Sequence, residues 1–390
     1  IYMVKICAYA ICGDEPLQFV KRWLRAVSYA DYIVVHCTTN MSKATKFLLR
    51  VKKLFQGKLI VNSVCYLDWR FDVPRNDSLK MIPEDADVCF CSDIDEIVIP
   101  EFFTDVRSAV EKMPNFKHIW YRFASDNVVD NNTVCVNRWF WNNKCHQRFG
   151  WKWQFPVHET LTTTRDDYSG DIYLDKNKIY LFHFPTDKPR TDYLPLLELR
   201  LKENPTEIFS LFYLIREYWF NNKAIEGLNI CNKLLYELDV NQKPHDNYMS
   251  TALYIYMGKF YDALHQQELS ISCYKKAVEK YPKILDGYVA LVQDLIYQGR
   301  INEAKHFWEY AQCNANFELN DWKLFSHYRS EWKMLQIDAD IAAWSNDYES
   351  AYSKISKAVE QAVKTKQIWY AKQEYLWEDY RFIKNKAHVD

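Results

Sequence analysis

The sequence predicts an α/β domain built on a mostly parallel sheet, followed by an all-helical domain. Apolar runs alternate with helix-like stretches through the first 91 residues, which is typical of a parallel sheet covered by helices. After about Lys188 the apolar residues follow helical spacing with few breaks, and the 390 residues include only 8 Gly and 12 Pro. We place the boundary between residues 190 and 191. At about 150 residues per domain, the length fits two to three domains.

The first 40 residues predict a βαβ unit. An apolar run, Met3–Cys12, precedes a helix-like stretch from Pro16 to Tyr29, and a second run follows at Tyr32–Cys37. Asp14 and Glu15 stand ahead of Pro16, where acidic groups suit the positive end of a helix.

The same alternation continues along the chain. We expect helices at Lys43–Phe55 and Arg75–Met81, and strands at Lys58–Cys65 and Asp87–Cys91. Between Phe116 and Phe184, short stretches rich in aromatic and β-branched residues predict further strands that complete the first domain.

Helix pairs recur in the second domain at about the 34-residue spacing of tetratricopeptide-type repeats. The predicted pairs cover Ser210–Leu238, Ala252–Tyr281, Asp286–Cys313 and, more weakly, Lys333–Val363. The final helices, over 351–386, are expected to be longer than the pattern. Stacked pairs leave a concave groove suited to a partner or peptide. The alternative is that they cap the first domain or form a homodimer interface.

Composition excludes several classes of protein. The formal charge is -1 and no basic stripe is visible, so nucleic acid is not an expected partner. No apolar run approaches 18 residues and no charged-then-apolar start is present, so we expect no membrane span, no signal peptide and a cytoplasmic location. Eleven cysteines, an odd number, favour free thiols over a disulfide framework.

An acidic cluster follows the strand expected at 87–91. Consecutive side chains of an extended segment alternate faces, so we expect Asp93 and Asp95 to project to one side while Ile94 points into the core. Two carboxylates at the end of a strand suit a hard cation, Mn²⁺ or Mg²⁺, that neutralises a diphosphate. Ligands bind beyond the carboxyl ends of strands in such sheets.

Two further groups are candidates for a binding site. Asp72, Arg75 and Asn76 stand together at a helix start and suit a nucleotide base and ribose, although a capping Asp with a surface Arg is the simpler interpretation. Glu159 follows His158 in a strand-rich region and is the right type of group to take a proton from an acceptor. Histidines flanked by apolar residues are more often core residues than ligands.

Other catalytic motifs are absent from the sequence. It contains no Gly-x-Gly-x-x-Gly or Gly-Lys-Ser/Thr loop, no Gly-x-Ser-x-Gly elbow and no His-Glu-x-x-His helix. Oxidoreductase, kinase and hydrolase functions are therefore disfavoured.

Five ordered motifs resemble those of bacterial and phage family 2 glycosyltransferases, which have a GT-A fold and, in some members, a C-terminal tetratricopeptide-like domain. The motifs are Ile11-Cys12-Gly13-Asp14-Glu15, Trp69-Arg70-Phe71-Asp72 through Arg75-Asn76, Asp93-Ile94-Asp95-Glu96, Pro156-Val157-His158-Glu159, and His183 through Lys188 and Arg190. They resemble the family's ICKNE, W-x-x-D-x-x-R-N, D-x-D-E, P-V-H-E and H-x-x-D-x-x-K-x-R patterns. The resemblance covers nearly the whole chain.

The resemblance implies transfer of a sugar, with inversion, from a nucleotide-sugar donor, typically a UDP-sugar, to a peptide or glycan acceptor. Asp93, Asp95 and His183 would hold the metal, and Glu159, with Glu96 in reserve, would be the base. The implied donor-binding residues are Asp14, Glu15, Asp72, Arg75, Asn76, Asp93, Arg148, His158, Lys188 and Arg190.

One departure from the family concerns the end of the second strand. The family's D-T-G-S-T-D corresponds here to His36-Cys37-Thr38-Thr39-Asn40 and the residues that follow, so both acids are missing. A catalytically degenerate scaffold that works as a binding protein is therefore the main alternative. A nucleotidyltransferase with the same metal geometry is a further one, disfavoured because no Gly-rich, Lys-bearing phosphate loop is present.

Overall fold

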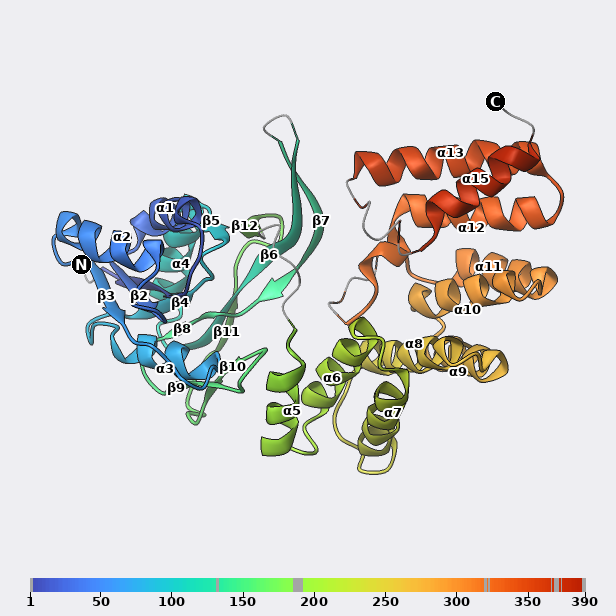
Figure 1. Cartoon of the computed structure of the whole chain (residues 1–390). Helices are drawn as coiled ribbons and strands as arrows, with labels where there is room; N and C mark the ends of the chain where they lie inside the picture. The colour runs from blue at the N-terminus through green and yellow to red at the C-terminus, as the bar shows by residue number, and fades with distance from the viewer. Residues whose placement is uncertain are drawn as a thin grey trace. The chain divides into compact units, whose positions relative to one another are not determined.

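The chain folds into two compact units, Ile1–Arg200 and Leu201–Asp390. The computed structural model describes residues 3–130, 133–184, 192–318, 321, 323–365, 367, 372 and 374–387 (Figure 1). The first unit is mixed α/β and the second is helical, so the predicted change of structural class along the chain is confirmed.

Four parallel strands form the first part of the sheet. They are β1 (Ile6–Cys12), β2 (Tyr32–Cys37), β3 (Leu59–Ser63) and β4 (Val88–Cys91), in the order β3-β2-β1-β4. Each lies within a run expected from the sequence. The chain adds strands on one side of β1 and then crosses to the other side to form β4.

Helices cover both faces of these strands, which explains their continuous apolar sequences. The helices are α1 (Leu17–Ala26), α2 (Lys43–Val51), α3 (Asp72–Lys80) and α4 (Pro100–Lys112), with short 3₁₀ turns at Val27–Tyr29 and Lys52–Phe55. Ile6 and Ala8 of β1 belong to the core that contains residues of α1, α2 and α4. The alternate residues Cys7 and Tyr9 pack in a second core that includes Leu79 of α3.

The aromatic region extends the sheet, as expected. The added strands are β5 (Glu96–Val98), β6 (Phe116–Asp130), β7 (Thr133–Asn142), β8 (Cys145–Gln147), β11 (Gly170–Tyr173) and β12 (Ile179–His183). Beyond β4 the order is β8-β6-β12-β5, and β7 and β11 also pair with β6. A separate antiparallel pair consists of β9 (Trp151–Gln154) and β10 (Thr160–Thr163). β8 runs antiparallel to β4, which matters for the site.

The helical part begins with α5 (Leu194–Glu203) and continues with four helix pairs, which confirms the four predicted passages (Figure 1). They are α6 (Ile208–Phe220) with α7 (Ala224–Asp239), α8 (Asn247–Ala263) with α9 (Gln267–Lys280), α10 (Leu285–Tyr297) with α11 (Ile301–Asn314), and α12 (Glu331–Trp344) with α13 (Tyr348–Lys364). A 3₁₀ turn, Ser326–Arg329, precedes α12, and α15 (Leu376–Lys386) ends the described chain. The expectation of longer helices over 351–386 is met by α13, which has 17 residues, but not by α15, which has 11.

The four pairs share one turn geometry. The first helix of each pair is followed by a residue in the left-handed conformation: Asn222, His265, Gly299 and Asn346, with φ of 54°, 57°, 69° and 63°. The next N–H donates to the carbonyl five residues back at 2.9–3.0 Å in every case, which is the hydrogen bond of a Schellman motif. This recurrence identifies the pairs as structural repeats, even though only one of the four positions is glycine.

Two expectations from composition concern thiols and membranes. The cysteines whose side chains the structure describes are all free, and most are buried. Among the described helices, none combines the length and the apolar character needed to cross a membrane.

Candidate active site

The candidate site lies where the order of strands reverses. The chain continues from β1 to β2 and β3 on one side, whereas β4 lies on the other side of β1. The carboxyl ends of β1 and β4 therefore flank the topological switch point, where open α/β sheets bind ligands. Cys12 ends β1 and is followed by Asp14 and Glu15, and Cys91 ends β4 and is followed by Asp93.

The acidic cluster after β4 is a turn, so the expectation of an extended segment there is wrong. The N–H of Glu96 donates to the carbonyl of Asp93 at 3.0 Å, and the Glu96 carboxylate accepts from the N–H of Asp93 at 2.8 Å. These two hydrogen bonds stabilise a turn in place of an extended strand. Ile94 is buried as expected, with 3% of its surface exposed.

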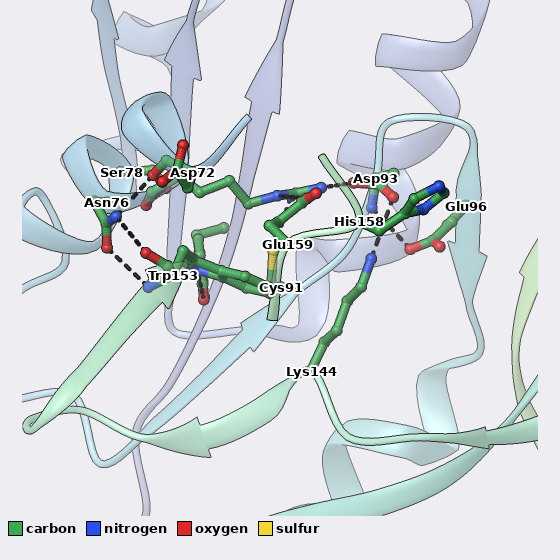
Figure 2. Close-up of polar contacts among 12 residues, drawn as sticks. Asp72, Asn76, Ser78, Cys91, Asp93, Glu96, Lys144, Trp153, His158 and Glu159 are labelled. Carbon is green, nitrogen blue, oxygen red and sulfur yellow. Dashed lines mark hydrogen bonds and ion pairs between the residues drawn. The ribbon is translucent and has the colours of Figure 1, made fainter. Parts of the chain in front are cut away.

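Arg75 of α3 is the centre of the site, because it contacts Asp93, Glu159 and Cys91, three residues that Figure 2 labels. Its guanidinium donates to Asp93 Oδ1 at 2.6 Å, to Glu159 Oε1 at 2.6 Å and to the Cys91 sulfur at 3.1 Å. It also lies 5.3 Å from the centre of the Trp153 ring. Because the Arg75 side chain is only 4% exposed, the simpler interpretation of it as a surface residue is wrong.

Lys144 is a second cation at this edge, and the sequence did not reveal it. Its Nζ lies 3.4 Å from Asp93 Oδ2, and its carbonyl accepts from the N–H of Cys91 (Figure 2). The antiparallel pairing of β8 with β4 produces this position, since Cys145 lies opposite Phe90. Lys144 could be identified only from the pairing of β8 with β4, which no local sequence pattern encodes.

The same pairing excludes Arg148 from donor binding. Gln147 lies opposite Val88, at the amino end of β4. Arg148 therefore lies near the amino end of β4, whereas Asp93 follows its carboxyl end. Its guanidinium donates to the carbonyls of Ile82 and Pro83 at 2.6 and 3.0 Å. The assignment of Arg148 to the site is therefore wrong.

The charged groups at the site shift one another's pKa values. Burial by itself would raise the pKa of Asp93, but Arg75 and Lys144 outweigh burial and lower it. Burial would raise the pKa of Glu159 in the same way, and Arg75 and Lys144 again lower it. Burial and then the charge of Asp93 raise the pKa of Glu96 to about 7. Strongly perturbed groups at the edge of a sheet are typical of functional sites.

Asp93 and Asp95 have different partners. Both oxygens of Asp93 contact cations, whereas Asp95 Oδ2 lies 3.2 Å from Nε2 of His183. Within the part of the chain that the structure describes, no three His, Cys, Asp or Glu side chains are grouped so that they could hold a metal. In this arrangement the residues do not fit a divalent cation, because Asp93 would have to release Arg75 or Lys144 to bind one.

Asp72 and Asn76 have structural partners. Asp72 accepts two hydrogen bonds from Arg70, at 2.6 and 2.9 Å. The Asn76 amide donates to the carbonyls of Asp72 and Trp153, and its oxygen accepts from the N–H of Trp153. Asn76 thus ties α3 to β9, and its expected contact with a nucleotide is replaced by these backbone bonds.

The loop that presents Glu159 is strained. Phe155 and His158 have φ of 80° and 48°, which non-glycine residues seldom adopt. The buried Arg200 of α5 donates to the carbonyls of Val157 and His158 at 2.9 and 3.0 Å and lies 3.8 Å from the centre of the Phe155 ring. Arg200 therefore holds the loop in place, a role that the sequence did not indicate.

The end of β2, where the family's acid is missing, has its own polar chain. His36 Nε2 lies 2.5 Å from the Tyr66 hydroxyl, which donates to Asp77 Oδ2 at 2.7 Å. Beside β1, Glu15 accepts from the Cys12 thiol at 3.2 Å. Lys188 and Arg190 lie outside the described residues.

Comparisons with known proteins show a limited likeness. No family model matches the chain, and no curated protein matches it. Among solved structures, the MamA protein is 15% identical, with a TM-score of 0.32 over 45% of this chain and 83% of that one. YrrB, described as a TPR protein with an unusual peptide-binding site, is 13% identical, with a TM-score of 0.31 over 46% and 81%. TTC0263, a thermophilic TPR protein in Thermus thermophilus, is 19% identical, with a TM-score of 0.35 over 49% and 88%. Likeness at this level assigns no function.

Proposed function

We propose that the N-terminal unit binds a nucleotide-sugar at the switch point and transfers its sugar to an acceptor. The observation that carries this proposal is the placement of two cations, Arg75 and Lys144, around Asp93 at the carboxyl end of β4. A buried arginine needs compensating charges and is costly to hold for stability alone, so Arg75, which is 4% exposed at the edge where such sheets bind ligands, favours a function. Arg75, Asp93 and Glu159, which belong to three of the motifs that resemble those of family 2 glycosyltransferases, contact one another there.

The proposed reaction is a single displacement. A hydroxyl or amide of the acceptor attacks the anomeric carbon of the donor, the bond from that carbon to the diphosphate oxygen breaks, and a carboxylate takes the acceptor proton. In this proposal, Arg75 and Lys144 would stabilise the departing diphosphate. Glu159 is bonded to Arg75, which makes it a weak proton acceptor in this arrangement, so Glu96 is retained as the second candidate base.

Dependence on Mn²⁺ or Mg²⁺ is part of the proposal that follows from the motif rather than from the geometry. When bound, such a cation would supply further neutralisation of the diphosphate. Asp93, Asp95 and His183, its ligands according to the motif, do not form a site for it in the arrangement described above, so they would have to rearrange to hold it. Asp93 would need to exchange an ion pair for it, so metal dependence has to be measured separately from donor binding.

A second candidate function is a binding scaffold. It is favoured by the ion pairs that occupy both oxygens of Asp93 and by the missing acid after Val35. In that case the helical repeats would be the working part and would bind a protein or peptide, and the charged cluster would be a structural remnant.

Titration calorimetry with the full chain distinguishes the two functions. We expect UDP or another nucleoside diphosphate to bind, and at least one nucleotide-sugar to be turned over with release of free diphosphate. Asp93→Asn should lower nucleotide affinity or turnover at least tenfold. Asp85→Asn is the matched control, because Asp85 is an exposed acid paired with Lys5 away from the site.

The metal is tested in the same series. Each titration is repeated with Mn²⁺, with Mg²⁺ and with EDTA, and Asp95→Asn is added as a variant. Loss of turnover in EDTA with retained nucleotide binding would support the cation. Absence of both binding and turnover across a panel of uridine, guanosine, thymidine and cytidine sugars would leave the scaffold function.

A further inference from the structure

A cavity of about 190 Å³ lies in the helical unit among α10, α12 and α15. Its lining includes Tyr297 of α10, Asp340 and Trp344 of α12, and Asp379 and Phe382 of α15. At about 30 Å³ per water molecule, this volume corresponds to about six waters. It is smaller than the roughly 300–1,000 Å³ typical of pockets for small-molecule ligands, so it suits a single side chain.

The cavity holds acidic groups that lack a matching cation. Asp379 accepts a hydrogen bond from Gln336, and no hydrogen bond or ion pair to Asp340 is found among the described residues. Burial, followed for Asp340 by the charge of Asp379, raises the pKa of both carboxyl groups, that of Asp379 to about 6. Repulsion of this kind is relieved when a positive charge arrives.

The nearest described ammonium is already engaged. Lys333 is fully buried, and its Nζ lies 2.9 Å from Glu374 Oε2 and 3.0 Å from Gln336 Oε1. His327 lies 3.2 Å from the other oxygen of Glu374, and burial lowers its pKa, which favours the neutral form. Lys333 also lowers the pKa of Asp340 and of Asp379, but its direct ion pair is with Glu374, so three carboxyl groups share one buried ammonium and are left with excess negative charge.

Aromatic rings at the cavity are unusually exposed. Trp344 and Phe382 are each 55% exposed, and Tyr297 is 62% exposed. Rings of this size are normally largely buried in a folded unit. Carboxylates beside exposed aromatic faces form the kind of surface that attracts an organic cation with an apolar stem.

We propose that this cavity binds a lysine or arginine side chain of a peptide partner. The ammonium or guanidinium group lies against Asp340 and Asp379, and the aliphatic stem packs on Trp344 and Phe382. The site belongs to the helical unit and does not depend on sugar transfer, so it holds for either function proposed above.

Fluorine NMR of the full chain labelled with 5-fluorotryptophan tests this proposal, with the Trp344 signal assigned from Trp344→Phe. The probes are the Nα-acetyl amides of lysine, arginine and the neutral isostere norleucine. We expect saturable shifts of the Trp344 signal with the two cations and at least tenfold weaker binding by norleucine. Equal binding of norleucine, or a saturable shift with Mg²⁺ alone, would overturn the proposal.

Matched variants locate the effect. Asp340→Asn and Asp379→Asn should each weaken binding of the lysine probe at least fivefold, whereas Glu360→Gln removes the same charge from an exposed position on α13 and should leave it unchanged. Retained folding is verified by circular dichroism. Unchanged affinity in both aspartate variants, or absence of any saturable shift in the native chain, would also overturn the proposal.

Discussion

Replacement of Arg75 by methionine tests the central feature of the candidate site. Methionine keeps much of the side chain's length but removes the guanidinium that bridges Glu159 and Asp93 at 2.6 Å each. Removal of one partner from a buried ion pair typically costs ~3–5 kcal/mol, because the other charge stays buried without compensation. Glu159, with 11% side-chain exposure, is such a charge.

Asp93 contributes less to the expected loss. Its side chain is 37% exposed and keeps Lys144 at 3.4 Å, so solvent screens most of the missing interaction. We therefore expect Arg75→Met to lower the free energy of unfolding by about 3 kcal/mol. At typical urea m-values of ~1–3 kcal/mol/M, the midpoint of the transition that reports on the first unit should fall by about 1–3 M.

Two comparisons separate this effect from a general loss of packing. In the double variant Arg75→Met/Glu159→Gln, the uncompensated charge is gone, so part of the loss should be recovered, with a coupling energy of ~1–3 kcal/mol. Lys5→Met breaks the exposed pair with Asp85, which solvent screens, and should leave the urea midpoint nearly unchanged. If Arg75→Met costs no more than Lys5→Met, or if the double variant shows no coupling, the guanidinium does not hold the site together.

Three further substitutions test other parts of the structure. Burial lowers the pKa of His146 from 6.5 to about 3, so the unfolded chain binds more protons between these values. The free energy of unfolding should therefore fall on acidification in this pH range by up to ~1.4 kcal/mol per pH unit. Urea unfolding of His146→Gln at the same pH values should show a smaller loss. If the native and variant chains lose stability in parallel, the lowered pKa of His146 is contradicted. Gly258→Ala would place a methyl group 2.3 Å from the Tyr274 ring. We therefore expect the free energy of unfolding to fall by ~1–3 kcal/mol and the melting temperature to fall with it. An unchanged melting temperature would contradict the close packing. In Arg200→Met, two carbonyls of the loop at His158 lose their hydrogen-bond donor, so limited proteolysis should cleave this loop faster. Arg200→Lys should be partly protected. Equal cleavage of the native and variant chains would argue against this role of Arg200.

The strands and helices of the first 91 residues could be predicted because local pattern and tertiary structure agree there. The strand β1 is buried on both faces, so its sequence is apolar throughout, and α1, which follows it, shows one apolar stripe. The turn at Asp93 could not be predicted in the same way. Its two hydrogen bonds depend on how the Glu96 side chain folds back, and an alternation of residue types does not encode that choice.

The candidate site was predicted only in part. Arg75, Asp93 and Glu159 were identified through motifs, but their mutual contacts depend on α3, β4 and the loop after β9 meeting in three dimensions. Lys144 and Arg148 are four residues apart and lie at opposite edges of the sheet, because one short antiparallel strand separates them. The spacing of Lys144 and Arg148 in the sequence therefore does not indicate which of the two lies at the candidate site.

The Schellman turns of the helical unit have a consequence for folding kinetics. Each helix pair closes through contacts between neighbours in sequence, so an early nucleus can form in any one of them at little entropic cost. The sheet of the first unit instead has high contact order, since it joins Phe90 to Cys145 and Val98 to Leu181. In a stopped-flow refolding experiment, the helical unit should regain its structure first, and the slow phase should belong to the sheet.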